Sequence, residues 1–457
     1  MLELLGSGLI SIWLDLTGIE IQPVSALEIL AVQSSLGFVI APDPSLVGAM
    51  TTRKYLQGLV SSKLIPPNLA SHQGIWLQSG PILMANHQGT VPLPAASLTK
   101  VATSLASFKT LGPNYQFQTL VGITGPIVNR VVNGDLVVSG GGDPMFVGEE
   151  AIAIGNTLNK MGIQQVKGNL VITGKFAMNF SSNPNIAGQI FKQALNHKNW
   201  NRNLTYQHST MPKGTLKPQL VINGVINVAP PSRHNQLLPQ TLLIRHLSLP
   251  LHQIIKEMNV YSNNEIAEML SQNIGGTDVV RSISSQLAMV PQSEIQLING
   301  SGLGRENRIS PRAVTAMFMA LQREAMASNL TLADLFPTSG LDNRGTMQHR
   351  NMPNATVMKT GTLSDVSALA GVLPTRDRGL VWFTIINRGN QVSSFRAEQD
   401  KLLQQLVKQL ATDNIFLKTL TPHSGDKSVL SLGSPNRNEV MYKVHYPCQN
   451  RTLRKLC

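Results

Sequence analysis

Ser97 and Lys100 are the pair of side chains that most directly suggests chemistry, because they stand three residues apart in the segment PAASLTK. This segment is rich in helix formers, and residues three apart on a helix share a face, so the Lys100 amine can reach the Ser97 hydroxyl. A serine becomes a nucleophile when a base takes its proton, and a lysine is such a base when burial or nearby cations lower its pKa. Alone, this S-x-x-K pattern indicates either an activated serine or an ordinary polar pair.

Two further triplets follow in the chain. Ser262-Asn263-Asn264 lies within a helical pattern, where alone it is typical of a turn or a helix cap. Lys359-Thr360-Gly361 lies in a strand-like segment. The order S-x-x-K, S-D-N, K-T-G is the signature of β-lactamases and penicillin-binding proteins, and here the middle triplet reads S-N-N. Three motifs in this order and context favour a serine acyl-transfer enzyme.

Both helices and strands are needed to position these motifs. Apolar periodicity and breaker residues predict helices at 97–111, 149–160, 249–273, 311–336 and 393–411. Alternating or β-branched segments predict strands within 74–88, 116–140, 168–174, 355–373 and 380–388. The turns at Ser79-Gly80-Pro81 and Asn133-Gly134 are the hairpin signals. Ser97 is therefore expected at a helix start and Lys359 in a strand.

Beyond the triplets, the chain resembles the S13 peptidases, the penicillin-binding protein 4 type of D-alanyl-D-alanine carboxypeptidase. The matching stretches, within about residues 74–390, are PAASLTK, NGDLVVSGGGDP, MNVYSNNEIAEML, NGSGLGRENRISP and KTGTLSDVSALAGVL. The resemblance implies an α+β fold of the β-lactamase/transpeptidase type, in which helices flank an antiparallel sheet and an inserted, mostly β domain interrupts the chain.

The resemblance also implies catalytic roles. Ser97 attacks the carbonyl of a D-Ala-D-Ala peptide to form an acyl-enzyme, with Lys100 as its base. Ser262 relays a proton to the leaving D-alanine amine, and Asn264 holds the substrate amide. Lys359 sustains a positive field for the substrate carboxylate. Water then hydrolyses the acyl-enzyme, and the scheme needs neither a metal nor a cofactor.

Further substrate contacts follow from the same resemblance. Thr360 binds the terminal carboxylate, with Gly361 and Thr362 beside it, and the backbone N–H groups of Ser97 and Thr362 form the oxyanion hole. Two more positions match residues that bind the stem-peptide side chain. These are Asp143 in GGGDP and Arg305 in GLGREN, whose charges suit the amine and carboxylate of diaminopimelate. A turn cap for Asp143 and a structural ion pair for Arg305 remain the alternatives.

The expected domain organisation has four parts. An apolar and acidic N-terminal segment covers residues 1–45, and a serine D,D-peptidase domain is drawn from 46–123 and 250–420. An inserted domain covers 124–249, and a basic C-terminal tail covers 421–457. Both cysteines, Cys448 and Cys457, lie in this tail, and no Cys/His cluster has the spacing of zinc ligands.

Charge and hydropathy restrict the partners. The 457 residues carry a formal net charge of +13, which favours anionic partners, but no zinc or recognition-helix motif indicates nucleic-acid binding. The longest uncharged run near the N-terminus, 29–42, is shorter than the ~20 residues of a membrane span. No basic region of a signal peptide precedes it. A periplasmic, cell-envelope location is therefore expected from the substrate alone.

The leading hypothesis is a D,D-carboxypeptidase acting on peptidoglycan stem peptides, with β-lactam antibiotics as acylating inhibitors. Endopeptidase activity stays open, because both activities cleave the same type of D-centred bond, and the oligomeric state also stays open. A non-catalytic wall-binding protein is the first alternative. A class A β-lactamase is disfavoured, because its deacylating E-x-x-x-N pattern is missing and Glu294 and Asn299 are five residues apart.

Overall fold

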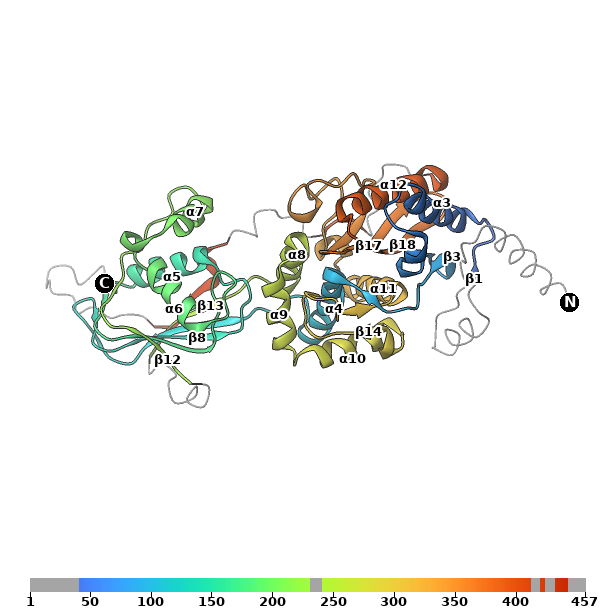
Figure 1. Cartoon of the computed structure of the whole chain (residues 1–457). Helices are drawn as coiled ribbons and strands as arrows, with labels where there is room; N and C mark the ends of the chain where they lie inside the picture. Colours follow the sequence, from blue (N-terminus) through green and yellow to red (C-terminus); the bar gives the residue numbers. More distant parts are fainter. Residues whose placement is uncertain (1–40, 231–240, 412–419, 424–431, 443–457) are drawn as a thin grey trace. The chain divides into compact units, whose positions relative to one another are not determined.

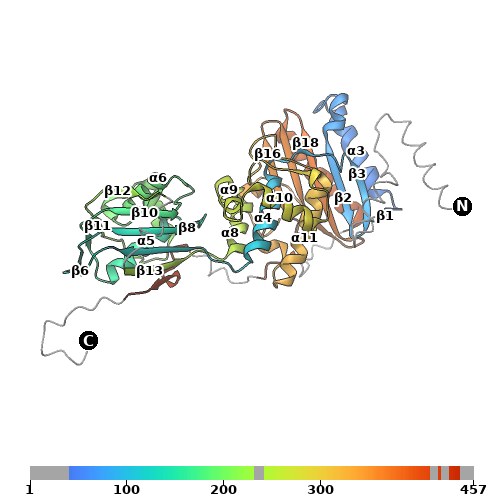
Figure 2. The same ribbon diagram turned by 90° about the horizontal axis from the view of Figure 1, so that it is seen from below.

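The computed structural model describes residues 41–230, 241–411, 420–423 and 432–442 (Figures 1 and 2). The described chain divides into two compact units. The first is drawn from residues 1–113 and 251–425, and the second from residues 114–250 and 426–457. Most of the N-terminal segment 1–45 and both cysteines lie outside the described residues.

The boundaries of the second unit differ from the sequence expectation in two places. It begins at residue 114 rather than 124, because β5 (Gln118–Ile123) pairs with β8 and β13 of that unit. The segment 432–442, expected within a loose tail, contributes β19 (Asn438–Val440), which pairs antiparallel with β13. Strand pairing therefore includes residues 118–123 and 438–440 in the second unit.

The first unit is organised around a six-stranded sheet that is antiparallel except at its short edge strand β1. In spatial order, its strands are β1 (Ala41–Pro42), β3 (Ile82–His87), β2 (Gly74–Ser79), β18 (Gly379–Arg388), β17 (Val366–Thr375) and β16 (Val357–Leu363). Strand β17 reads VSALAGVLPT and is buried along its whole length. A strand that is buried at every position requires cover on both faces of the sheet.

Helices supply that cover (Figure 1). On one face lie α3 (Val47–Ser61) and α12 (Val392–Leu410), whose Leu56 and Leu403 pack in one apolar cluster with Phe383 of the sheet. On the other face lies α11 (Pro311–Ala327). The other α-helices among the described residues of the unit are α4 (Thr99–Leu111), α8 (Leu251–Tyr261), α9 (Asn264–Asn273) and α10 (Thr277–Ala288). A small sheet of β14 (Ile295–Gln296), β15 (Arg308–Ile309) and β4 (Leu93–Pro94) completes it.

The helical pattern over 249–273 predicts one helix, but the chain forms two, α8 and α9. Between them, Ser262 has a φ of 54°, in the left-handed region that interrupts a right-handed helix. The side chain of Asn263 then accepts a hydrogen bond from the Ile266 N–H at 2.9 Å and caps α9. The break places Ser262 at a helix junction.

The described residues of the second unit form two sheets and three α-helices. Its larger sheet has the order β12 (Ile226–Val228), β10 (Leu170–Lys175), β8 (Leu136–Gly141), β5, β13 (Thr241–Leu247) and β19. Its smaller sheet has the order β11 (Val221–Ile222), β9 (Gln165–Val166), β7 (Val131–Val132) and β6 (Ile127–Val128). Its helices are α5 (Gly148–Lys160), α6 (Pro184–Ala194) and α7 (Arg202–Thr210), so this unit combines strands with substantial helix.

The hairpin signal at Asn133-Gly134 is wrong. The hairpin of this segment instead joins β6 to β7 across Asn129 and Arg130, whose φ values are 48° and 66°. Gly134 separates β7 from β8, which belong to different sheets. A Cβ at Gly134 would lie 2.6 Å from the backbone nitrogen of Gly125, so this glycine is needed for close packing of two loops.

Candidate active site

Ser97 lies in the short 3-10 helix η2 (Ala96–Leu98), which leads directly into α4. The preceding Ala96 has a φ of 48°, a conformation that costs a non-glycine residue about 1–3 kcal/mol. In the first turn of α4, Lys100 donates a hydrogen bond from Nζ to Ser97 Oγ at 3.1 Å. The three-residue spacing thus brings the hydroxyl and the amine into direct contact.

The Lys100 amine is held by a buried set of acceptors. Its Nζ also donates to Asn264 Oδ1 at 2.7 Å and to the Ser301 carbonyl at 2.8 Å, and the residue is fully buried. Burial lowers the pKa of Lys100 to about 7, although the carboxylates of Glu268 and Glu265 act in the opposite direction. A substantial share of Lys100 is therefore uncharged at neutral pH and can accept the Ser97 proton.

Ser262 and Lys359 form a second hydroxyl–amine pair. Lys359 lies on β16, is fully buried, and donates from Nζ to Ser262 Oγ at 2.9 Å and to the Thr360 carbonyl at 2.7 Å. Burial, and then the nearby charge of Lys100, lower the pKa of Lys359 well below its usual range. The free site therefore disfavours two positive lysines at once, and a bound anion would stabilise the second charge.

Two glycines allow the segments around Ser97 to approach closely. A Cβ at Gly302, whose φ is +84°, would lie 1.9 Å from the Ala96 carbonyl oxygen. A Cβ at Gly361 on β16 would lie 3.1 Å from the Ser97 backbone nitrogen. The approach at Gly302 admits only glycine, and the approach at Gly361 leaves little room for a side chain. The backbones of β16 and of the 300–302 loop consequently lie against the nucleophile.

Glu268 is a residue of this site that the motifs do not indicate. Its carboxylate accepts hydrogen bonds from the backbone N–H groups of Gly300 at 3.0 Å and Ser301 at 2.9 Å. It thereby fixes the loop whose carbonyl accepts from Lys100, and its charge raises the lysine pKa. The sequence feature that could have indicated Glu268 is its position four residues after Asn264, because this spacing places both side chains on one face of α9.

Arg396 on α12 is a second residue outside the motifs. Its guanidinium donates a hydrogen bond to Thr362 Oγ1 at 2.8 Å. The arginine is exposed and lies more than thirty residues after the K-T-G triplet, so no local pattern connects the two. This contact places a permanent cation beside the end of β16, where the resemblance expects the substrate carboxylate.

The pKa of Lys100 predicts a pH dependence of acylation. A general base acts in its uncharged form, so the acylation rate constant with benzylpenicillin should rise with pH, follow an apparent pKa near 7, and level off above it. Glu268→Gln removes a charge that raises this pKa and should move the inflection to lower pH. Stopped-flow or quenched acylation from pH 5.5 to 9 measures both. A flat profile, or a rate that falls as pH rises through 7, would refute Lys100 as the base.

The two residues expected to bind the stem-peptide side chain lie in different units. Arg305 belongs to the first unit, where its Nε donates to Asp365 at 3.0 Å while 59% of its side chain is exposed. Asp143 belongs to the second unit and is buried, with Oδ1 accepting from the Met145 N–H at 2.8 Å. That contact is the turn cap named above as its alternative. Burial also raises the pKa of Asp143 to about 7.

Glu294, considered as a deacylating carboxylate, has other partners. It is buried and accepts hydrogen bonds from Ser310 Oγ and from the Arg312 guanidinium. The side chain of Asn299 instead contacts the backbone of the 300–303 loop, accepting from the Gly302 N–H at 2.8 Å. Both side chains therefore organise local structure.

Several known proteins are similar to this chain in sequence or fold. A model of the D-Ala-D-Ala carboxypeptidase 3 (S13) family matches residues 60–184 and 185–410. The D-alanyl-D-alanine carboxypeptidase DacB of Haemophilus influenzae is 24% identical over 388 residues, which cover 65% of this chain and 80% of that protein. A D-alanyl-D-alanine carboxypeptidase of Actinomadura sp. (strain R39) is 30% identical over 184 residues, which cover 36% of this chain and 34% of that protein.

Among solved structures, the chain is similar to the penicillin G-acylated Bd3459 predatory endopeptidase of Bdellovibrio bacteriovorus in complex with its immunity protein Bd3460. The TM-score is 0.63 at 21% identity, and the similarity covers 74% of this chain and 91% of that one. This likeness establishes the α+β peptidase fold expected from the sequence.

Proposed function

Because the chain belongs to the D-Ala-D-Ala carboxypeptidase 3 (S13) family, we propose that it hydrolyses the D-Ala-D-Ala end of peptidoglycan stem peptides through an acyl-enzyme on Ser97. It is a serine-type carboxypeptidase by family. The observation that carries the assignment to Ser97 is its contact with Lys100, a buried amine whose pKa is lowered to about 7. A nucleophile paired with a base of suitable pKa is the requirement for covalent acyl transfer.

The acylation step follows from these contacts. Ser97 Oγ attacks the carbonyl carbon of the penultimate D-alanine while its proton passes to Lys100 Nζ. The backbone N–H groups of Ser97 and Thr362 stabilise the resulting oxyanion. When the C–N bond breaks, Lys100 gives the proton it took from Ser97 to the leaving D-alanine amine by way of Ser262, which accepts a hydrogen bond from Lys359 at 2.9 Å, and Lys100 becomes uncharged again. Water then attacks the ester, Lys100 again serves as base, and Ser97 is released.

Residues of β16 bind the terminal carboxylate of the substrate in this proposal. We assign it to the Thr360 hydroxyl and to the charge of Lys359, with Gly361 leaving room beside Ser97. A bound carboxylate would also favour the protonated form of Lys359, whose pKa is low in the free site. Asn264, whose Oδ1 is held by Lys100, can donate from Nδ2 to the substrate amide.

The same chemistry accounts for β-lactam binding, since a strained lactam carbonyl with a nearby carboxylate presents the same groups to Ser97. A solved relative of this fold carries penicillin G as its acyl group. The substrate places the enzyme in the cell envelope, and we propose the periplasm as the compartment. Within the described ranges, no helix combines the length and apolar character needed to cross a membrane.

The function is tested by following two products at once. The purified chain should release D-alanine from a diacetyl-L-lysyl-D-alanyl-D-alanine peptide and should form a long-lived adduct with benzylpenicillin. Enzymatic D-alanine detection and penicillin hydrolysis assays measure the two reactions. Rapid turnover of penicillin without release of D-alanine would instead identify a β-lactamase and contradict the proposal.

We propose that Arg305 binds the carboxylate of the stem-peptide side chain. Its Nη groups have no hydrogen-bond partner among the described residues and can donate to such a group. Arg305→Ala should lower kcat/KM for diaminopimelate-containing peptides by about tenfold and leave a simple D-Ala-D-Ala peptide unaffected. The nearby exposed Arg308→Ala is the matched control and should change neither. An equal loss on both substrates would mean that the Arg305–Asp365 ion pair is only structural.

A further inference from the structure

Cationic side chains outnumber acidic ones in the second unit. Residues 114–250 contain eleven Lys and Arg and only four Asp and Glu. All four are engaged within the unit, since Glu149, Glu150 and Asp143 are buried and Asp135 accepts a hydrogen bond from the Asn169 N–H at 2.7 Å. The one further described acid of the unit, Glu439 of β19, is paired with Arg245. The uncompensated surface charge of this unit therefore attracts anions.

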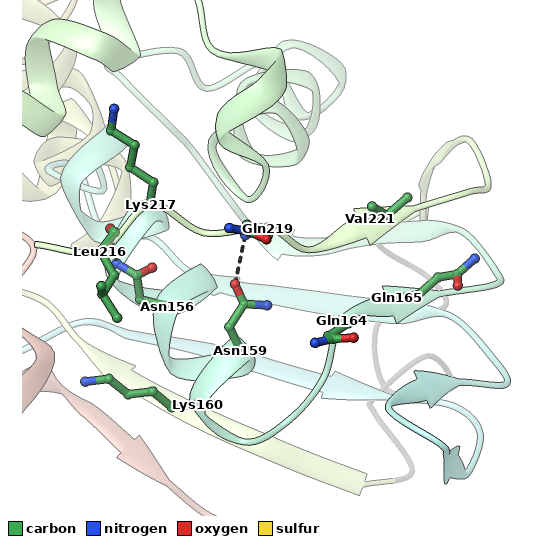
Figure 3. Close-up of a pocket in the computed structure, with 9 residues that line it drawn as sticks. All are labelled: Asn156, Asn159, Lys160, Gln164, Gln165, Leu216, Lys217, Gln219 and Val221. Carbon is green, nitrogen blue, oxygen red and sulfur yellow. Dashed lines mark hydrogen bonds between the residues drawn. The ribbon is translucent and has the colours of Figure 1, made fainter.

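A polar groove of about 660 Å³ opens on this unit between the C-terminal half of α5 and the segment 216–221 (Figure 3). Its lining consists of five carboxamide residues, two lysines and two aliphatic residues, namely Asn156, Asn159, Gln164, Gln165, Gln219, Lys160, Lys217, Leu216 and Val221. Figure 3 shows both lysines toward one end and Gln165 and Val221 toward the other. The volume lies within the range of small-molecule sites, and no carboxylate lines the groove.

The walls of the groove are fixed before any ligand arrives. Asn156 Nδ2 donates to the Leu216 carbonyl at 2.7 Å, and Asn159 Oδ1 accepts from the Gln219 N–H at 2.8 Å (Figure 3). Asn159 Nδ2 donates to the Ile163 carbonyl at 2.8 Å, which closes the end of α5. These bonds connect α5 to the facing segment and spare a ligand the entropy cost of ordering the site.

Other polar groups of the groove are free to bind. Within the part of the chain that the structure describes, the side-chain amides of Gln164, Gln165 and Gln219 and the ammonium groups of Lys160 and Lys217 have no hydrogen-bond partner. Each amide offers two donors and an acceptor, which suit hydroxyl and acetamido groups, and each ammonium suits a carboxylate. The lining thus matches a ligand that carries all three groups.

We propose that this groove binds the N-acetylated, carboxylate-bearing glycan–peptide polymer of the cell wall, at a site separate from the catalytic serine. The identity of the polymer rests on the proposed function, because peptidoglycan is the material that this enzyme would act on and it carries acetamido, hydroxyl and carboxylate groups in every repeat.

Sedimentation of the full chain with purified insoluble peptidoglycan tests this proposal. Lys160→Gln/Lys217→Gln should weaken the apparent affinity about tenfold, because two charge-assisted contacts are lost. Gln164→Ala/Gln219→Ala, which leaves the charge unchanged, should weaken it several-fold as well. The control Lys167→Gln/Arg202→Gln removes the same charge from exposed positions of the second unit outside the lining and should bind as the parent chain does. Chitin, an N-acetylated glycan without carboxylates, should be bound far less.

The proposal would be overturned if the parent chain did not bind peptidoglycan or bound chitin equally well. It would also be overturned if the groove lysine variant bound as the parent chain does, or if the groove and control lysine variants lost binding equally. A loss confined to the lysine variant, with the amide variant unaffected, would also do so, because it indicates attraction to charge alone. Benzylpenicillin acylation of every variant should match the parent chain. Binding that persists while acylation fails would reject the proposed catalytic function and leave the groove assignment standing.

Discussion

Ser97→Ala should abolish acylation by benzylpenicillin and reduce D-alanine release by at least ~10⁴-fold, because it removes the atom that forms the acyl bond. The substitution deletes one hydroxyl at the start of α4 and leaves the buried lysine with its other two acceptors, Asn264 and Ser301. Folding should therefore be retained, as thermal unfolding and far-UV circular dichroism would show. Labelled penicillin and D-alanine detection measure the chemical loss.

The matched control lies on the same helix. Ser107 is buried on α4, and its hydroxyl has no hydrogen-bond partner within the described residues, so Ser107→Ala makes the same change without touching the site. This variant should keep full activity. D-alanine release by Ser97→Ala at more than a few per cent of the parent rate would disprove the covalent role of Ser97.

Lys100→Met should reduce the acylation rate by about 10²- to 10⁴-fold, since it replaces the general base with an apolar chain of similar length. Removing one fully buried amine also removes its repulsion of Lys359, whose pKa should then rise. The residual rate should lose the inflection near pH 7 that Lys100 gives the parent enzyme. Acylation kinetics across the pH range measure both effects.

Lys109 provides the control for this change, because it lies on the same helix in an exposed ion pair with Glu324. Lys109→Met removes one positive charge from α4 and should leave the rate and its pH dependence unaltered. Should Lys100→Met acylate at the parent rate, or keep the inflection, another group must take the Ser97 proton.

The sequence indicated the elements that carry the motifs because each has a strong local signal. The helix formers after Pro94 predicted α4, and the strand-like segment 355–373 predicted the strand that carries Lys359. The S-x-x-K spacing alone implied contact between Ser97 and Lys100, since it depends only on helix geometry. The resemblance extended this to the fold, which the family match and the structural comparison confirm.

Features that depend on contacts between segments far apart in the chain could not be predicted from the sequence. Arg396 reaches Thr362 from another element, and no spacing rule connects them. Residues 118–123 read as a strand, but only pairing with β8 and β13 assigns that strand to the second unit. The hairpin predicted at Asn133-Gly134 is absent because glycine is needed there for another reason. Gly134 lies close to the backbone of Gly125, and such a close approach favours glycine just as a tight turn does.

The central claim, that Ser97 is the acylated nucleophile of a Lys100-activated site, is tested most directly by intact-mass spectrometry of the chain after reaction with benzylpenicillin, followed by peptide mapping. One penicilloyl group per chain is expected, carried by Ser97 and absent from Ser97→Ala. Attachment at another residue, or no adduct on folded protein with several β-lactams, would contradict it.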